Sequence, residues 1–172
     1  MKIKILSLCL ITFLAYNTKT TAQESTKVLL ENARTKAQKE GKAIFIKFEA
    51  SWCGWCKKMT KDMKAADTKQ FFEDNYVIVP VVVNESKGKE NLENAGSRNL
   101  LKKYEGDKAG LPFWVILDSN LKVITNSYDS NGQNLGGPAS KTEVSEFIKK
   151  IKKSAKVVSE NDLENIKKQF IQ

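Results

Sequence analysis

The chain has 172 residues, 41% of them hydrophobic and 28% charged, which is the composition of one globular domain with modest additions. It contains no histidine, and this excludes histidine-based triads, imidazole acid–base catalysis and histidine metal sites. The formal net charge is +9, but the lysines alternate with Glu and Asp along the chain. We therefore expect a solvated basic surface and no nucleic-acid binding.

Residues 1–22 have the pattern of an export signal. A basic start at 1–4 precedes an apolar run at 5–16, and small residues at 20–22 offer a cleavage site near Ala22. The apolar run is shorter than the roughly 20 residues that a membrane-spanning helix needs. We expect an exported chain, periplasmic or secreted, whose net charge falls to +6 because the leader holds three lysines and no acid.

Hydrophobic periodicity predicts alternating helices and strands after this leader. In chain order these are helix 25–40, strand 43–48, helix 53–66, short helix 68–75, strand 76–83, helix 94–104, strands 113–117 and 122–125 as a hairpin, a helix capped by Ser140 and Glu143, and a last helix at 159–171. The first two strands alternate with helices and should pair in parallel. Pro80 lies within the second strand and indicates an edge, a bulge or an N–H that was free in any case.

Two cysteines, Cys53 and Cys56, lie where the first strand meets the following helix. Cys9 would leave with the leader. A cysteine at a helix N-terminus has its thiolate stabilised by unpaired backbone N–H groups and the helix dipole, and a second cysteine one turn later can close a ring with it. Structural zinc would need four ligands, usually two such pairs or cysteine with histidine, so the pattern favours thiol–disulfide exchange. Cys53 is then the nucleophile and Cys56 the resolving thiol.

The segment Trp52-Cys53-Gly54-Trp55-Cys56-Lys57 resembles the active site of the thioredoxin superfamily, and the order of elements is similar to that fold. Gly110-Leu111-Pro112-Phe113 resembles the family's cis-proline segment, and Gly136-Gly137 its glycine turn before the last helix. The resemblance covers roughly residues 25–155. It implies an α/β thioredoxin fold with a central mixed sheet of four to five strands flanked by helices, to which this chain adds a C-terminal helix.

The resemblance also implies roles for residues around the cysteines. Leu111-Pro112 should form a cis peptide bond, with the backbone of Leu111 offered to the substrate. Trp52, Gly54 and Trp55 should border the substrate groove as an apolar rim suited to unfolded chain segments. No metal or other cofactor is expected beyond the redox-active Cys53–Cys56 disulfide.

The sequence departs from typical thioredoxins at two places. Gly54-Trp55 replaces Gly-Pro between the cysteines and is similar to exported thioredoxin-like proteins. Lys47 stands where a buried Asp usually transfers a proton to the second cysteine. Glu49 has the same strand parity as Lys47, so both side chains should point to one face. Glu49 is therefore a candidate proton acceptor for Cys56 with Lys47 as its ion partner, the alternative being a surface ion pair at the strand end.

We interpret the chain as a signal peptide (1–22), a thioredoxin-like domain (23–158) and a helical extension (159–172). The expected function is that of an exported, monomeric thiol–disulfide oxidoreductase, with a lean toward reduction because no histidine lies between the cysteines. Its partners would be disulfide-containing proteins and a membrane or periplasmic thiol electron donor. The alternatives are a disulfide isomerase or oxidase, or a non-catalytic Cu(I)-binding protein using the two thiolates, with Met59 and Met63 on the following helix.

Overall fold

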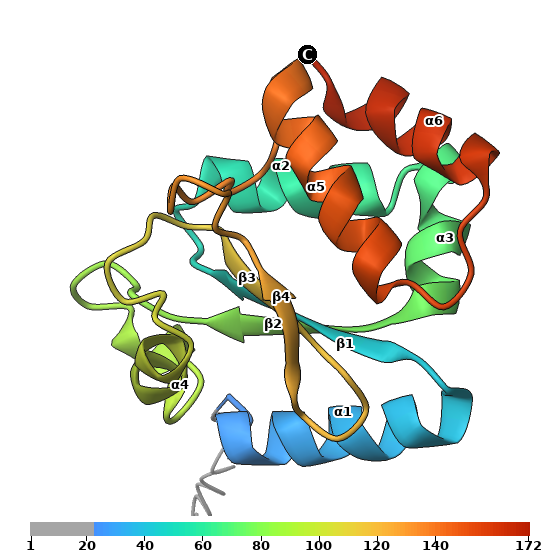
Figure 1. Ribbon diagram of the computed structural model, residues 1–172. Coiled ribbons are helices and arrows are strands. Elements are labelled where there is room, and N and C mark those ends of the chain that lie inside the picture. The colour runs from blue at the N-terminus through green and yellow to red at the C-terminus, as the bar shows by residue number, and fades with distance from the viewer. Residues whose placement is uncertain (1–22) are drawn as a thin grey trace, which may run out of the picture.

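The computed structural model describes residues 23–172, so the predicted leader lies outside the described part of the chain. Four strands form one mixed sheet in the order β2-β1-β3-β4 (Figure 1). Their bounds are β1 Ala43–Glu49, β2 Tyr76–Val82, β3 Phe113–Leu117 and β4 Val123–Asn126. β1 and β2 pair in parallel and the other neighbours are antiparallel. This confirms the expected thioredoxin fold, with four strands among residues 23–172.

Helices cover both faces of this sheet (Figure 1). They are α1 Thr26–Glu40, α2 Gly54–Met63, α3 Ala66–Asn75, α4 Ser97–Lys103, α5 Lys141–Ser154 and α6 Glu160–Phe170, with a short 3-10 helix η1 at Glu90–Leu92. α1 and α4 pack on one face, where Ile44 and Ile46 of β1 point. α2, α3, α5 and α6 pack on the other face, where Phe45 points. The two cores follow from the alternation of side chains along a strand buried on both sides.

Two predicted helices are shorter than expected. The helix predicted over 53–66 ends at Met63, because Ala65 is extended (φ −64°, ψ 153°) and the Thr68 hydroxyl donates to the Asp62 carbonyl that a continuing helix would use. The helix predicted from residue 94 begins at Ser97, because Gly96 adopts φ 84°. The first break orients α3 independently of α2, and the helix that carries Cys56 is therefore short.

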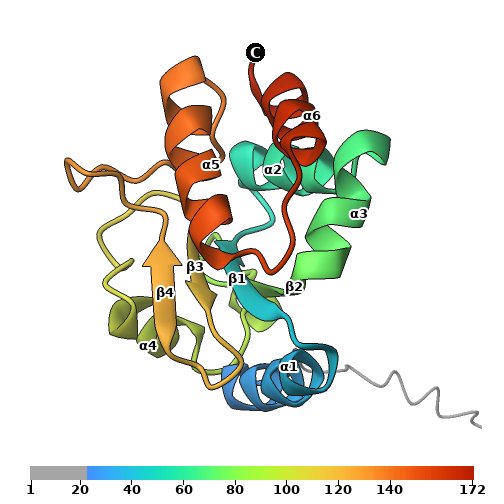
Figure 2. The ribbon, with the colours of Figure 1, turned by 45° about the vertical axis from the view of Figure 1, so that its right-hand side comes forward.

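The final helix, α6, is part of the larger core. Its Leu163, Ile166 and Phe170 are buried with residues of α2, α3 and α5, and α6 lies beside α3 and α5 (Figure 2). The Phe170 ring packs 5.3 Å from Phe147 and 6.2 Å from Phe72, measured between centroids. The Gln169 amide also donates to the Asp62 carboxylate of α2 at 3.0 Å. α6 therefore braces the helix that begins at the cysteines.

Strand β2 is an edge strand, which explains the proline within it. Pro80 has no N–H to offer. Beyond it, the N–H of Val82 donates to the Asn94 side chain and its C=O accepts from the Asn94 N–H. Asn94 therefore closes the end of this edge, which limits pairing with another chain.

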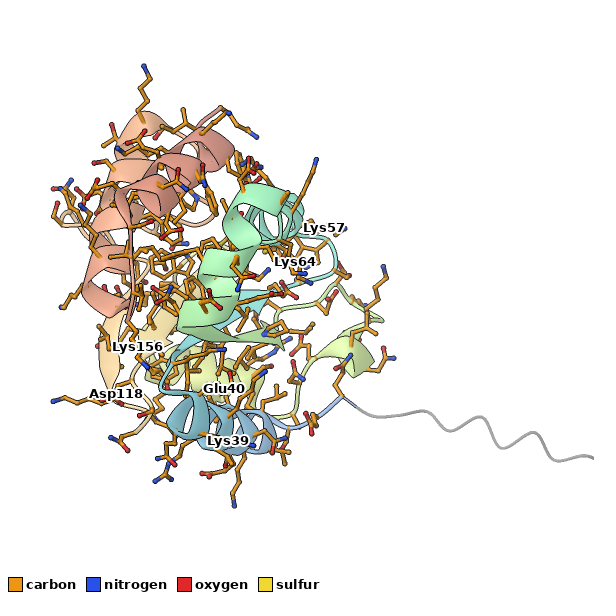
Figure 3. The ribbon with its side chains drawn as sticks, turned by 90° about the vertical axis from the view of Figure 1, so that its right-hand side faces the viewer. Lys39, Glu40, Lys57, Lys64, Asp118 and Lys156 are labelled. Atoms are coloured by element: carbon orange, nitrogen blue, oxygen red, sulfur yellow. A yellow bond between two sulfur atoms is a disulfide. The ribbon has the colours of Figure 1, made fainter. Side chains whose placement is uncertain are left out.

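Charged side chains cover the outside of the molecule (Figure 3). Lys57 of α2 and Lys64 at its C-terminal end are among those labelled there, and exposed ion pairs such as Arg34–Glu31 and Lys69–Glu73 link lysines or arginines to neighbouring acids. Exposed pairs of this kind add little stability and keep the surface hydrated. Among residues 23–172, no helix has both the length and the apolar character needed to cross a membrane.

Candidate active site

Cys53 and Cys56 form a disulfide at the start of α2. Cys53 is the N-cap of this helix, and its Sγ accepts a hydrogen bond from the Cys56 N–H at 3.1 Å. The first-turn N–H groups of a helix have no partner within it, so they and the helix dipole favour negative charge at this sulfur. Both cysteines are buried in the disulfide form, with 3% of Cys53 and 1% of Cys56 exposed.

The cis-proline segment lies against the disulfide. The Leu111–Pro112 bond is cis, as the resemblance implied, and Leu111 packs on the small cluster of Ala50, Cys53 and Cys56. The Asn134 amide donates to the carbonyls of Gly110 at 2.7 Å and Pro112 at 3.2 Å. These bonds engage the carbonyls on either side of Leu111. Asn134 was missed from sequence, because nothing local connects the 127–138 loop to residue 111.

Two indoles border the disulfide at the surface. Trp52 is 54% exposed and Trp55 is 52% exposed, so both indoles are accessible from solvent. A Cβ at Gly137 would come within 3.1 Å of the Trp55 carbonyl, so the glycine turn allows the chain before α5 to approach Trp55 closely. A Cβ at Gly54 would meet no atom within 4 Å, so space alone does not require glycine between the cysteines.

Lys47 and Glu49 form an ion pair directly beneath α2. Lys47 Nζ lies 2.6 Å from Glu49 Oε2, and their side chains are 3% and 26% exposed. Nζ also donates to the Cys56 carbonyl at 3.2 Å and to Thr60 Oγ1. The predicted common face is confirmed, but with Lys47 buried the contact is not a surface ion pair. The three acceptors satisfy all three ammonium hydrogens.

Glu49 and Thr60 line two pockets next to this ion pair. A pocket of about 430 Å³ also touches Cys56, Lys57 and Glu85. A second, of about 630 Å³, opens between α1, α3 and the edge strand and reaches Lys47. The partly exposed Glu49 side chain therefore shares a solvent-accessible pocket with Cys56.

Soft-metal ligands are not gathered around the cysteines. Met59 and Met63 are buried in the core beneath α5 and α6, whereas Cys53 and Cys56 belong to the separate cluster with Ala50. In the stretch from residue 23 to 172, no three His, Cys, Asp or Glu side chains are placed to hold a metal ion.

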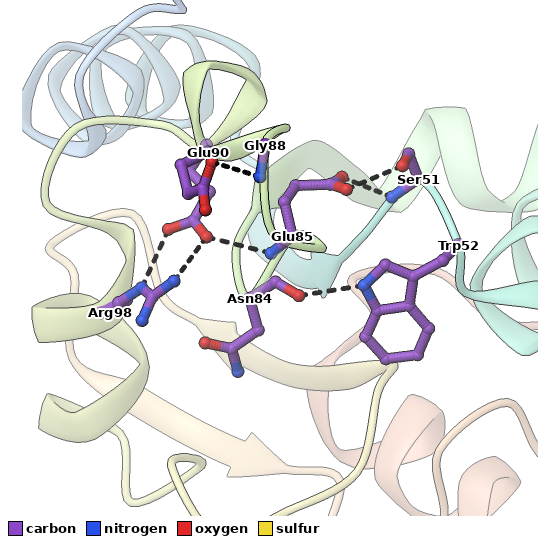
Figure 4. A network of polar contacts seen from close by, with 8 residues as sticks. Ser51, Trp52, Asn84, Glu85, Gly88, Glu90 and Arg98 are labelled. Atoms are coloured by element: carbon purple, nitrogen blue, oxygen red, sulfur yellow. Dashed lines mark hydrogen bonds and ion pairs between the residues drawn. The ribbon is translucent and has the colours of Figure 1, made fainter.

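Sequence reasoning also missed the contacts that precede Cys53. Glu85 accepts hydrogen bonds from Ser51, and the carbonyl of Asn84 accepts one from the Trp52 indole (Figure 4). A signal was present, because β1 and β2 are parallel and the residues after parallel strands meet at one edge of the sheet. The pairing of particular side chains still required the tertiary structure.

Comparison with curated proteins finds one relative with related chemistry in its name. The chain is 34% identical over 92 residues to Protein disulfide-isomerase 1 of Dictyostelium discoideum, a match that covers 53% of this chain and 21% of the relative. The chain thus spans about a fifth of the length of the curated relative it matches.

Solved structures give more distant similarities. A disulphide isomerase from Xylella fastidiosa Temecula1 aligns with TM-score 0.49 and 20% identity over 66% of this chain and 78% of that one. The C-terminal domain of DsbD from Neisseria meningitidis aligns with TM-score 0.43 and 19% identity over 61% and 84%. The thioredoxin-like family model matches residues 25–119, which hold both cysteines and the cis-proline. The chain therefore belongs to the thioredoxin-like family.

Proposed function

We propose that this chain is an exported thiol–disulfide oxidoreductase that acts through Cys53 and Cys56. The observation that carries the proposal is the Cys56 N–H directed at Cys53 Sγ, at the first turn of α2. Membership of the thioredoxin-like family and the name of the disulfide-isomerase relative support the same chemistry. The functional unit is residues 23–158, and α6 is a stabilising extension of it.

The first step uses the reduced protein and forms a mixed disulfide. The Cys53 thiolate attacks one sulfur of a substrate disulfide, a bond forms between Cys53 Sγ and that sulfur, and the other substrate sulfur leaves as a thiolate that takes up a proton. The Cys56 N–H, which donates to Cys53 Sγ, lowers the cost of the thiolate. Asn134 binds the carbonyls of Gly110 and Pro112, on either side of Leu111. Leu111 itself lies beside Cys53, and its backbone is offered to the substrate chain.

The second step releases the substrate. Cys56 loses its proton and attacks Cys53 Sγ, the mixed disulfide breaks, and the second substrate sulfur leaves as a thiolate that takes up a proton. Two electrons have then passed from the protein dithiol to the substrate disulfide, and the protein holds the Cys53–Cys56 disulfide. Glu49 is the proposed acceptor of the Cys56 proton, held in place by Lys47.

The substrates we propose are disulfide-containing proteins outside the cytoplasm. The leader pattern at 1–22 supports export, with cleavage near Ala22. Trp52 and Trp55 give an apolar rim for unfolded segments. A thiol protein of the membrane or periplasm would supply electrons, and the absence of histidine between the cysteines favours the reducing direction.

Reduction of insulin disulfides tests the proposal. The wild-type chain with dithiothreitol should accelerate insulin reduction, and Cys53→Ser should lower the rate on the order of 10³-fold or more because the thiol that attacks the substrate is lost. Cys56→Ser should instead accumulate a mixed disulfide with insulin chains, visible by mass spectrometry and lost on adding dithiothreitol. An inactive wild type that binds Cu(I) tightly through both thiolates would overturn the proposal in favour of a metal carrier.

The reduction potential distinguishes the direction of flux. A Cys53–Cys56 potential near that of thioredoxin, roughly −270 mV, is expected for a reductase, whereas one near −120 mV would mark an oxidase. Equilibration with glutathione buffers followed by thiol alkylation gives the value directly.

A further inference from the structure

Strand β2 leaves part of its outer edge open. Asn94 covers the last residue of this strand, since its side chain accepts from the Val82 N–H and its own N–H donates to the Val82 carbonyl. The N–H of the next residue, Val83, instead donates to a carbonyl of β1. Backbone groups of alternate residues along a strand point to the same side, so Ile78 and Pro80 share the outward direction of Val82. The N–H and C=O of Ile78 and the C=O of Pro80 therefore face outward, where no strand of residues 23–172 lies.

The pocket of about 630 Å³ lies along this open edge, between two layers of helices. Lys36 of α1 lines it from one face of the sheet, and Met63 of α2 and Phe72 of α3 line it from the other (Figure 1). Ile78 and Pro80 are exposed and line it as well. The pocket thus continues the layer of the sheet, and it offers both backbone partners and apolar contacts to an added strand. We call this pocket the β2 slot.

Lysines outnumber acids in the β2 slot. Five lysines and two glutamates line it, an excess of three positive charges. One of the glutamates, Glu49, is already bound by the buried Lys47. The other lies 3.7 Å from Lys69, and both of these side chains are exposed, so water weakens their attraction. The acids of the slot therefore do not cancel its positive charge.

Two lysines of the slot have no acidic partner. Lys36 and Lys64 form no ion pair within residues 23–172, whereas Lys42 is paired with Glu40 at 2.6 Å. Lys36 belongs to α1, and Lys64, labelled in Figure 3, stands at the C-terminal end of α2 in the other layer. A segment that enters the slot comes between these two layers. Its carboxylates would be attracted from both of them, and its lysines would be repelled.

We propose that the β2 slot binds an extended acidic segment of a partner protein, which adds to the sheet as a strand beside Ile78. The backbone of this segment pairs with the N–H and C=O of Ile78 and with the C=O of Pro80, and its carboxylates meet Lys36 and Lys64. A small anion would use the lysines alone and leave the backbone groups of Ile78 to water. Lysines along an edge repel another copy of the same chain but accept an acidic strand. The slot contains neither cysteine, so binding here does not require thiol–disulfide exchange.

Binding of a peptide of alternating glutamate and valine tests the proposal. The peptide contains no cysteine and carries a fluorescent label at one end, and its anisotropy with the oxidised protein gives a dissociation constant. We expect the matched peptide of alternating lysine and valine to bind at least about tenfold more weakly. Added salt should weaken binding of the acidic peptide, because the lysines that attract it are exposed.

Two variants separate the charge of the slot from its backbone groups. Lys64→Glu should raise the dissociation constant of the acidic peptide about 3- to 10-fold, because attraction to a carboxylate becomes repulsion. Lys61→Glu is the matched control and should change it by less than about twofold, since Lys61 lies one turn earlier on α2, is exposed and does not line the slot. Ile78→Pro removes the outward N–H, as proline already does at Pro80, and should raise the constant about 2- to 10-fold.

Hydrogen exchange measured by NMR locates the added strand. The Ile78 amide should exchange at least about tenfold more slowly with the acidic peptide bound, while the amides of β4, the opposite edge strand, should keep their rates. Equal binding of the two peptides would overturn the proposal. An Ile78 amide that stays unprotected, together with binding that Ile78→Pro leaves unchanged, would also overturn it, because the lysines would then bind a free anion.

A second copy of the chain is the remaining occupant that the test can detect. Protection of the Ile78 amide without peptide, in a protein that light scattering shows to be dimeric, would overturn the proposal in favour of edge-to-edge pairing. A protein that fails to reduce insulin disulfides would contradict the proposed function and would leave these binding measurements unaffected, since neither the slot nor the peptide contains a cysteine.

Discussion

The two cysteines of the disulfide are held by different parts of the molecule. Cys53 is held by loops: Ser51 and Trp52 before it are bound by Glu85 and Asn84, and Leu111 packs beside it. Cys56 is held from the interior, where Lys47 binds its carbonyl. The loop contacts lie near the surface, where a substrate can reach them, whereas the ionic contact of Lys47 is buried. We therefore predict that substrate capture and resolution depend on separate residues and can be changed separately.

Of the variants considered, Phe170→Ala should destabilise the interior around α2 most. Phe170 is fully buried against Phe72 and Phe147, so the cavity should lower the free energy of unfolding by about 3–5 kcal/mol. Urea unfolding of the oxidised protein measures it. Lys168→Ala on the exposed side of α6 is the control and should change stability by less than about 0.5 kcal/mol. Equal stability of Phe170→Ala and wild type would show that α6 does not brace α2.

Lys47→Met should destabilise only the contacts directly beneath Cys56. It leaves Glu49, the Cys56 carbonyl and Thr60 without their cationic donor, and we expect a loss of about 2–3 kcal/mol, below that of a fully buried pair because Glu49 is partly exposed. The double variant with Glu49→Gln should lose less than the sum of the two single variants, since neither charge then remains alone. Additive losses in urea unfolding would mean that the ion pair contributes no coupling energy.

The sequence predicted the two cysteines and the cis-proline better than the residues that hold them in place. Cys53, Cys56 and Pro112 are recognisable because their spacing and order along the chain carry the signal, and the strand parity of Lys47 and Glu49 placed them on one face. Burial of Lys47 under α2 was not foreseen, since a lysine on a strand is usually at the surface. Glu85 and Asn134 act across 34 and 22–24 residues of chain, and such pairs depend on how loops close over the sheet.

Glu49→Gln tests the proton transfer from Cys56 and should have the smallest effect of the three changes. If Glu49 accepts the Cys56 proton, the variant should release mixed disulfides about tenfold more slowly at pH 7, the low end for a general base because thiols ionise readily. The effect should shrink as pH rises past about 8.5, where a free thiol is already ionised and needs no base. Formation of the mixed disulfide at Cys53 should keep its rate, because that step belongs to the loop side.

Rapid quenching of single-turnover reactions with insulin separates the two steps. Glu73→Gln is a suitable control, since Glu73 lines the larger pocket near Lys47 but does not line the pocket that touches Cys56. A release rate in Glu49→Gln equal to wild type from pH 6 to 9 would remove Glu49 as the acceptor and leave the ion pair with a structural role. A change in both steps would instead show that the two sides of the disulfide are not independent.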